Sequence, residues 1–173
     1  MAEYYLISQL PSLDGINENI PIPVTEKQFF ELCSRFLVKK TFAELNKITL
    51  MPSRNYEKSS SALIEKWNEG ERNLRLALAK LRADKMNKHF DVGMESFPVG
   101  LLQAVRTAID IESPMEAEKF LNQYRLDFLE TLRPMDSFSE EFVFYYGLKL
   151  KLIERMRKFD SQSGETAYRK IYD

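Results

Sequence analysis

The sequence predicts an all-α protein, an irregular multi-helix bundle with one long helix over about residues 61–88. Six glycines and seven prolines in 173 residues are few, and they fall mainly between periodic segments. Sandwiches and barrels need many tight turns, so this composition disfavours them. Apolar residues also recur every three to four positions behind helix start signals. The hydrophobic content of 44% is enough to form a core.

The first 24 residues are expected to be a short extended segment or one short helix. Prolines at Pro11, Pro21 and Pro23 rule out a long helix there, because proline clashes with the preceding turn and donates no backbone hydrogen bond. Asp14 and Gly15 form a turn signal.

Two helix start signals follow. Thr25 with Gln28 three residues later has the pattern of a capping box, and it predicts a helix to about residue 38. Thr41 with Glu44 repeats the pattern and predicts a shorter helix that ends before the next proline.

A polar loop over residues 51–60 is expected to divide the helices into two groups and to act as a mobile segment or hinge. We therefore predict a single helical domain, residues 1–173. Within it, a small N-terminal lobe of about residues 1–56 packs on a bundle of about residues 60–173.

The long helix carries an unbroken apolar stripe that contains a glycine, Gly70. Glycine weakens a helix by about 1 kcal/mol relative to alanine, unless another backbone packs closely against it. The sequence therefore predicts a close helix crossing at this position. The stripe comprises Leu63, Trp67, Gly70, Leu74, Ala77, Leu78 and Leu81.

Three further helices are expected. Pro98 suits the first turn of a helix that runs to about Ile109. Ser113, Pro114 and Glu116 combine an N-cap, a first-turn proline and an acidic third position, and they predict a helix that ends at Arg133-Pro134. The last helix begins at about Ser139.

That last helix is apolar on several faces, so we expect it to be buried on more than one side. Its main stripe comprises Phe142, Tyr145, Tyr146, Lys149, Leu152, Ile153 and Met156, and four more apolar residues lie off it: Val143, Phe144, Leu148 and Leu150.

The sequence lacks the patterns of common cofactor and metal sites. The closest glycines, Gly93 and Gly100, are too far apart for a phosphate-binding loop. One cysteine and one histidine supply no zinc ligand set. Cys33 lies on an apolar helix face and is expected to be a small buried hydrophobe. His89 is expected to interact with the C-terminal dipole of the long helix. No cofactor and no metal are predicted.

Three acidic residues, Glu112, Glu116 and Glu118, cluster at a helix start, where the helix dipole favours negative charge. Electrostatic capping explains them without any catalytic role.

The long helix carries a basic ridge. Arg75, Arg82, Lys85 and His89 fall within one quadrant at 100° per residue. The alternatives are a solvated face, a docking site for an acidic protein, and a nucleic-acid site. The basic residues of this segment are Arg72, Arg75, Lys80, Arg82, Lys85 and Lys88.

A second basic run lies at the end of the last helix and is expected to pair with the acidic segment 110–118 inside the fold. It comprises Lys149, Lys151, Arg155, Arg157 and Lys158.

The formal net charge of −1 provides no overall field toward nucleic acid or anionic lipid. The N-terminus lacks a signal-peptide pattern, and no apolar run approaches the roughly 18 to 20 residues of a spanning helix. We expect a cytoplasmic protein.

Several segments, in order, resemble an uncharacterised bacterial family encoded beside V-type ATPase subunits, which is distantly similar to the C (d) subunit of that enzyme. The matching segments are 4–13, 73–83, 113–119, 127–129 and 146–155. They are helix starts and packing faces. The chain is shorter than a C subunit with its three similar helical lobes, so the resemblance implies that at least one lobe is missing or reduced.

The resemblance implies a non-enzymatic adaptor or accessory subunit that links the central stalk of the ATPase to its proteolipid ring. It implies contacts with other ATPase subunits, no nucleic acid, and membrane association only through the complex, at the cytoplasmic face of the inner membrane. The alternatives are a small enzyme, with segment 51–60 or 90–97 as a lid, or a nucleic-acid-binding helical protein. The predicted partner-binding residues are Arg72, Arg75, Arg82, Lys85, Tyr146 and Lys149.

Overall fold

The structure is a computed structural model that describes residues 2–16, 20–53, 58–90 and 97–158. Within these ranges it contains seven α-helices and no strand, which confirms the predicted all-α class and the long helix. The helices are α1 (Ala2–Gln9), α2 (Glu26–Phe36), α3 (Lys39–Lys47), α4 (Ala62–Lys85), α5 (Val99–Asp110), α6 (Pro114–Thr131) and α7 (Glu140–Arg157).

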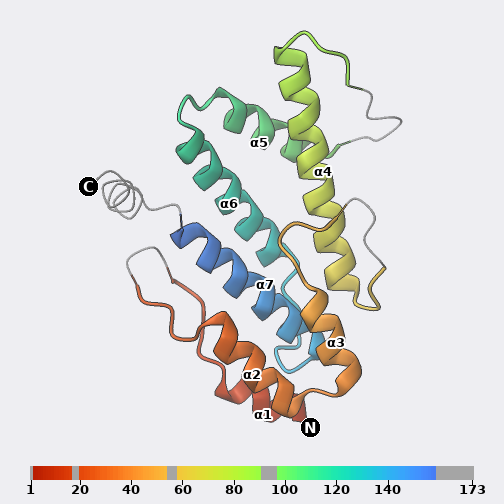
Figure 1. Cartoon of the computed structure of the whole chain (residues 1–173), viewed down its shortest axis with the longest axis vertical. Coiled ribbons are helices and arrows are strands. Elements are labelled where there is room, and N and C mark those ends of the chain that lie inside the picture. Colours follow the sequence, from red (N-terminus) through yellow and green to blue (C-terminus); the bar gives the residue numbers. More distant parts are fainter. Residues whose placement is uncertain (1, 17–19, 54–57, 91–96, 159–173) are drawn as a thin grey trace, which may run out of the picture.

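Helix α7 runs through the middle of the molecule, and α2, α3, α4 and α6 pack around it (Figure 1). Leu148 and Leu150 point to opposite sides of the helix, at 100° per residue, yet both are 0% exposed. The prediction that the last helix is buried on more than one side is therefore confirmed.

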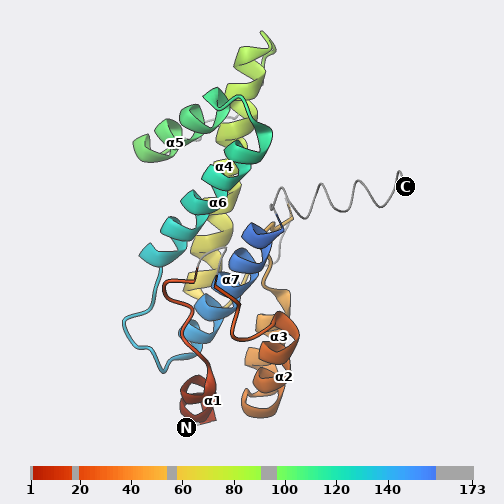
Figure 2. The ribbon, with the colours of Figure 1, turned by 90° about the vertical axis from the view of Figure 1, so that its left-hand side faces the viewer.

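The buried side chains form two apolar clusters. The larger surrounds α7 and includes Phe29 of α2, Trp67 of α4 and Leu129 of α6. The smaller joins the second half of α4 to α5 and the first half of α6, around Leu74 and Val105. Figure 2 shows α4 and α6 running lengthwise through both regions, with α5 across them and α1–α3 at the lower end.

The segment predicted as an N-terminal lobe has no apolar cluster of its own among the described residues. Helix α1 packs on α2, and α2 and α3 pack on α7. Its buried residues, such as Leu6 and Leu45, belong to the cluster around α7. The N-terminal residues 2–9 are helical rather than extended. Of the predicted loop 51–60, residues 54–57 lie outside the described residues, and so does any hinge there.

Most of the predicted helix starts are confirmed. Thr25 and Gln28 form a complete capping box at α2. Ser113 and Ser139 accept hydrogen bonds from backbone N–H groups in the first turns of α6 and α7. Pro98 is the N-cap of α5 rather than a first-turn residue.

The start predicted at Thr41 is wrong. Helix α3 begins at Lys39 after Val38, which makes no side-chain cap. Thr41 lies inside the helix and is buried, and its hydroxyl donates to Glu140 Oε1 at 3.0 Å. A tertiary hydrogen bond to α7 therefore uses the hydroxyl that the local pattern had assigned to a cap.

The close approach predicted at Gly70 is present, but a side chain and not a backbone makes it. A Cβ atom at Gly70 would lie 2.3 Å from Cε1 of Phe128 on α6. The Phe128 ring also stacks on Trp67, with 6.3 Å between the ring centroids. Glycine at position 70 leaves space for that ring.

We expect Gly70→Ala to destabilise the protein by about 1 kcal/mol, because overpacking against Phe128 outweighs the better helix propensity of alanine. In a Phe128→Leu background the same substitution should stabilise, since the ring is gone. Urea unfolding of the wild type, the two single variants and the double variant, followed by circular dichroism, measures the change in unfolding free energy caused by Gly70→Ala in each background. An equal effect of Gly70→Ala in the two backgrounds would contradict the steric explanation.

Candidate interaction surfaces and the buried charge network

The four predicted partner-binding residues on α4 differ in their surroundings. Arg75 donates from Nη2 to the carbonyl of Pro52 at 2.9 Å, and its Nε lies 3.3 Å from Glu71 Oε1. Lys85 donates to Asp110 Oδ1 at 2.8 Å and to the carbonyl of Ile109 at 3.2 Å. Arg75 and Lys85 are thus both engaged by intramolecular contacts.

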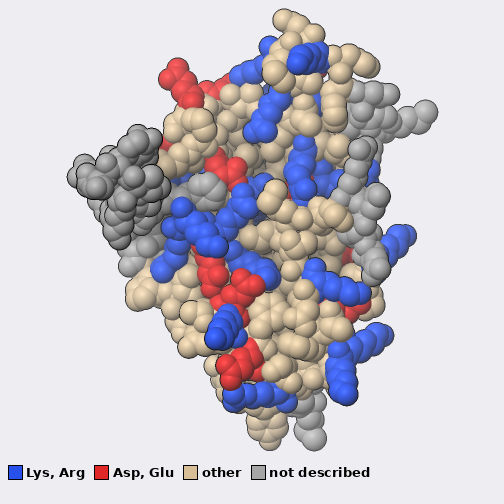
Figure 3. Space-filling model, viewed as in Figure 1, with Lys and Arg blue, Asp and Glu red and all other residues tan. Residues whose placement is uncertain are grey.

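The other two, Arg72 and Arg82, are exposed. In Figure 3 the charged side chains over the upper part of α4 are mainly lysine and arginine, whereas over α7 and α2 acidic and basic side chains lie together. His89 is exposed and lies four residues beyond the last residue of α4.

The two predicted partner-binding residues on α7 are buried. Tyr146 is 3% exposed and donates its hydroxyl to the carbonyl of Pro11 at 2.8 Å. Lys149 is 6% exposed and donates to Asp14 Oδ1 at 2.6 Å. A partner cannot reach either side chain in this conformation, so both leave the set of docking candidates. They hold the segment after α1 against α7.

The Lys149 ammonium is the centre of a polar cluster. It lies 2.7 Å from Glu130 Oε1 and 3.2 Å from the Tyr145 hydroxyl, which itself donates to Glu130 at 2.8 Å. Burial alone would lower the pKa of Lys149, but hydrogen bonds to Asp14, Glu130 and Tyr145 outweigh it and raise that pKa. The hydrogen bond from Lys149 lowers the pKa of Asp14. Burial raises the pKa of Tyr145 to about 12.

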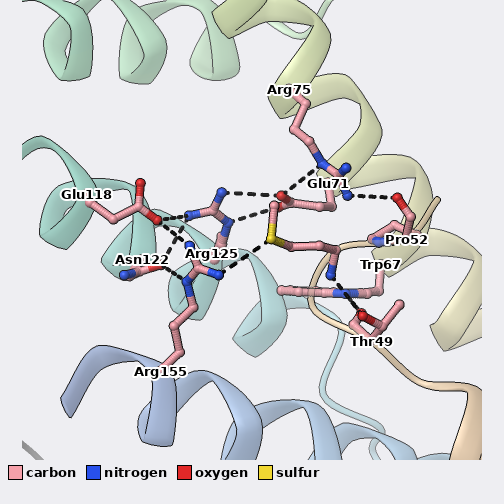
Figure 4. Close-up of polar contacts among 10 residues, drawn as sticks. Thr49, Pro52, Trp67, Glu71, Arg75, Glu118, Asn122, Arg125 and Arg155 are labelled. Carbon is pink, nitrogen blue, oxygen red and sulfur yellow. Dashed lines mark hydrogen bonds and ion pairs between the residues drawn. The ribbon is translucent and has the colours of Figure 1, made fainter. Parts of the chain in front are cut away.

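A second polar network joins α4, α6 and α7 (Figure 4). Arg125 binds Glu71 with two hydrogen bonds, from Nε at 2.9 Å and from Nη2 at 3.2 Å, and both side chains are nearly inaccessible to solvent. Arg125 and Arg155 also donate to Asn122 Oδ1 and to Glu118 Oε1. The network links three helices through charge-assisted hydrogen bonds.

The sequence contained a signal for this network that we missed. Glu71 lies between Trp67 and Leu74 on the apolar stripe of α4, and Arg125 lies between Leu121 and Leu129 on that of α6. Opposite charges inside two apolar stripes predict a buried ion pair, because an unpaired buried charge is very costly.

The predicted pairing between the second basic run and segment 110–118 is confirmed at one pair, Arg155 with Glu118 at 2.7 Å. Glu118 therefore has a tertiary role beyond the electrostatic capping assigned to it. Two other members of the run pair elsewhere: Lys149 as described above, and Lys151 with Glu26.

Exposed aromatic rings gather at the opposite end of the molecule from the tip of α4. Tyr4 is 56% exposed, Tyr5 62% and Phe138 47%. The rings of Tyr4 and Phe138 stack with 4.5 Å between their centroids. We call these three residues the aromatic end patch. None of the predicted partner-binding residues belongs to it.

The structure places Cys33 and His89 far apart, because α2 lies at the lower end and α4 ends at the upper end (Figure 1). They do not form a nucleophile and base pair. Cys33 is 0% exposed, as predicted, and burial raises the pKa of its thiol to about 12.

We expect Cys33 in the native protein to resist alkylation by iodoacetamide at pH 8, since only the thiolate reacts and the site is closed to solvent. In denaturing urea it should react at the rate of a free cysteine. Mass spectrometry of timed samples measures both rates, and rapid native-state alkylation would show that α2 opens readily from α7.

One cavity, of about 540 Å³, borders the segment that was considered as an enzyme lid. Its lining includes Glu44, Lys58 and Ser59, and Ser59 donates to Glu44 Oε2 at 2.8 Å. Another, of about 250 Å³, is mainly apolar and lies beside Gly70, Tyr124 and Phe128. Among the described side chains no three metal-ligating residues gather as a metal site requires. No helix within the described ranges is both long and apolar enough to cross a bilayer.

Residues 89–173 match the model of a family described as a protein of unknown function (DUF2764). The match covers just under half of the chain and contains α5, α6 and α7. Searches of curated proteins and of solved structures found no match.

Proposed function

We propose that this protein is a non-catalytic helical adaptor or accessory subunit of a bacterial V-type ATPase, which links the central stalk to the proteolipid ring. The starting point is the resemblance of five segments of the chain to a family encoded beside the subunits of that enzyme. An adaptor must be stiff and must offer separate surfaces to two partners.

The observation that supports the proposal most is the position of the exposed surfaces. The aromatic end patch lies at the lower end of the long axis, and the basic part of α4 lies at the upper end (Figures 1 and 2). A molecule with two chemically different surfaces at its two ends can bridge two partners. Tyrosine-rich patches and arginines are both enriched in protein interfaces.

The buried networks supply the stiffness. Glu71, Arg125 and Arg155 connect α4, α6 and α7, and Lys149 connects α7 to the segment after α1. Their charged groups are occupied by one another. Such groups fix the relative positions of helices rather than attack a substrate.

The proposal is tested with the chain tagged at its chromosomal locus in a bacterium that encodes it. After gentle solubilisation of membranes, the ATPase subunits should co-purify with the tagged chain in fixed proportion. Deleting the chain should reduce ATP-driven ion pumping relative to ATP hydrolysis. Complexes that assemble and couple normally in its absence would refute the adaptor role.

A matched pair of variants sharpens this test. Tyr4→Ser with Phe138→Ser removes the two stacked rings of the aromatic end patch, and Val38→Ser with Val99→Ser removes two other exposed apolar side chains. Only the first pair should weaken co-purification. Circular dichroism of both purified variants verifies that the fold is intact.

A further inference from the structure

The last part of α4 projects beyond the body of the molecule. After Leu78 only Ala83 is buried in this helix, and residues 84–90 are all exposed. Figures 1 and 2 show the tip of α4 extending above α5. Lys85 contacts Asp110 and the carbonyl of Ile109, but residues 84–90 contribute no buried side chain to the described part of the chain.

The projecting helix nevertheless ends in a well-formed cap. Asn87 has a φ of 52°, Lys88 N–H donates to the carbonyl of Ala83 at 2.9 Å, and Asn87 N–H donates to that of Asp84 at 3.1 Å. This is the Schellman arrangement, in which a left-handed residue satisfies the last carbonyls. The tip is a preorganised element, which reduces the entropy lost when a partner binds.

From Arg75 to the tip, one face of this helix carries positive charge and no acidic side chain, whereas Glu71, one turn earlier on the same face, pairs with Arg75. Arg75, Ala79, Arg82 and Met86 follow one another at intervals of four, three and four residues, and we call them the α4 stripe. Met86 is 61% exposed, the Arg75 side chain is 36% exposed, and Arg82 is exposed. Asp84, at 100° per residue, points away from the stripe.

The spacing of the stripe fits a second helix. Alternating intervals of three and four residues form the seam along which two helices pack at a small angle. Ala79, in the middle, allows a close approach, and the apolar stems of the two arginines can cover it. The stripe is about 16 Å long at 1.5 Å per residue, which matches about three turns of a partner helix.

From these observations we infer that the α4 stripe binds an acidic helix of a partner protein. Arg82 is exposed and can form a bidentate pair with a carboxylate, and Arg75, which already contacts Glu71 and Pro52, adds positive charge beside it. Met86 supplies an apolar contact at the end of the seam. Nucleic acid fits less well, because two arginines neutralise few phosphates and Met86 has no counterpart on a phosphate backbone.

This inference rests on the proposed function only for the identity of the partner. It is tested by photo-cross-linking of the full chain in the cells that produce it. The photo-cross-linker p-benzoylphenylalanine replaces Met86, and cross-linked peptides are sequenced. The expected product joins position 86 to a helical segment rich in aspartate and glutamate. Adding Arg82→Glu should lower its yield at least tenfold.

Arg106→Glu is the matched control, since Arg106 is an exposed arginine on α5 and the change of charge is the same. It should alter the yield less than twofold. Replacing the cross-linked partner's acidic residue with arginine should restore the product in the Arg82→Glu chain.

Three results would overturn the inference: no cross-link from position 86, a cross-link unaffected by Arg82→Glu, or a cross-link to nucleic acid. An acidic helix from a protein outside the ATPase would support the inference and count against the proposed function. If the ATPase subunits still co-purify with the Arg82→Glu chain, the proposed function is supported and the inference about the α4 stripe is contradicted.

Discussion

Replacing Arg125 with methionine is expected to destabilise the protein by about 3–5 kcal/mol, the usual cost of removing one partner from a buried ion pair. Glu71, whose side chain is 1% exposed, would lose both hydrogen bonds from Arg125. Arg75, with Nε at 3.3 Å from Glu71 Oε1, would remain as a cationic neighbour. Urea unfolding followed by the fluorescence of Trp67, the single tryptophan, reports the loss from inside the core.

The double variant Glu71→Leu with Arg125→Met should recover most of that stability, because two apolar side chains remove the buried charges together. Arg133→Met is the control. It breaks a pair with Asp14 in which both side chains are about half exposed, so it should cost less than about 1 kcal/mol. A double variant as unstable as Arg125→Met would show that the network contributes by more than charge pairing.

The helix starts could be predicted because their causes are local. The capping box at Thr25 and the serine caps at Ser113 and Ser139 each satisfy a backbone N–H within three residues. The same rule failed at Thr41, whose hydroxyl has a partner 99 residues away on α7. A local pattern cannot reveal which side chain a distant helix will bring close.

The candidate surfaces were less predictable for the same reason. The helical spacing placed Arg75, Arg82 and Lys85 near one another on α4, but the engagement of Arg75 and Lys85 depended on the positions of Pro52 and of α5. Tyr146 and Lys149 looked like surface candidates through the resemblance. Their burial follows from the loop after α1, which folds over α7 and supplies Pro11 and Asp14.

Lys149→Met is expected to cost about 2–4 kcal/mol at neutral pH and to loosen the segment after α1. It removes the cation between Asp14 and Glu130, and the partial exposure of both carboxylates keeps the loss below that of a fully buried pair. Hydrogen exchange should show faster exchange in residues 10–16 and little change in α5. Lys151→Met, which removes a more exposed lysine paired with Glu26, should cost less than about 1 kcal/mol.

The stability lost in Lys149→Met should depend on pH, and it should decrease at both acid and alkaline pH. The pKa of Asp14 is lowered from 3.8, so its contribution is complete above that value and disappears as the pH falls below it. The pKa of Lys149 is raised from 10.5, so its contribution is complete below that value and disappears as the pH rises above it. The difference in unfolding free energy between the wild type and Lys149→Met should therefore form a plateau near neutral pH and shrink toward both extremes. A difference that stays constant from acid to alkaline pH would mean that Lys149 stabilises the fold through the packing of its stem, and not through its charge.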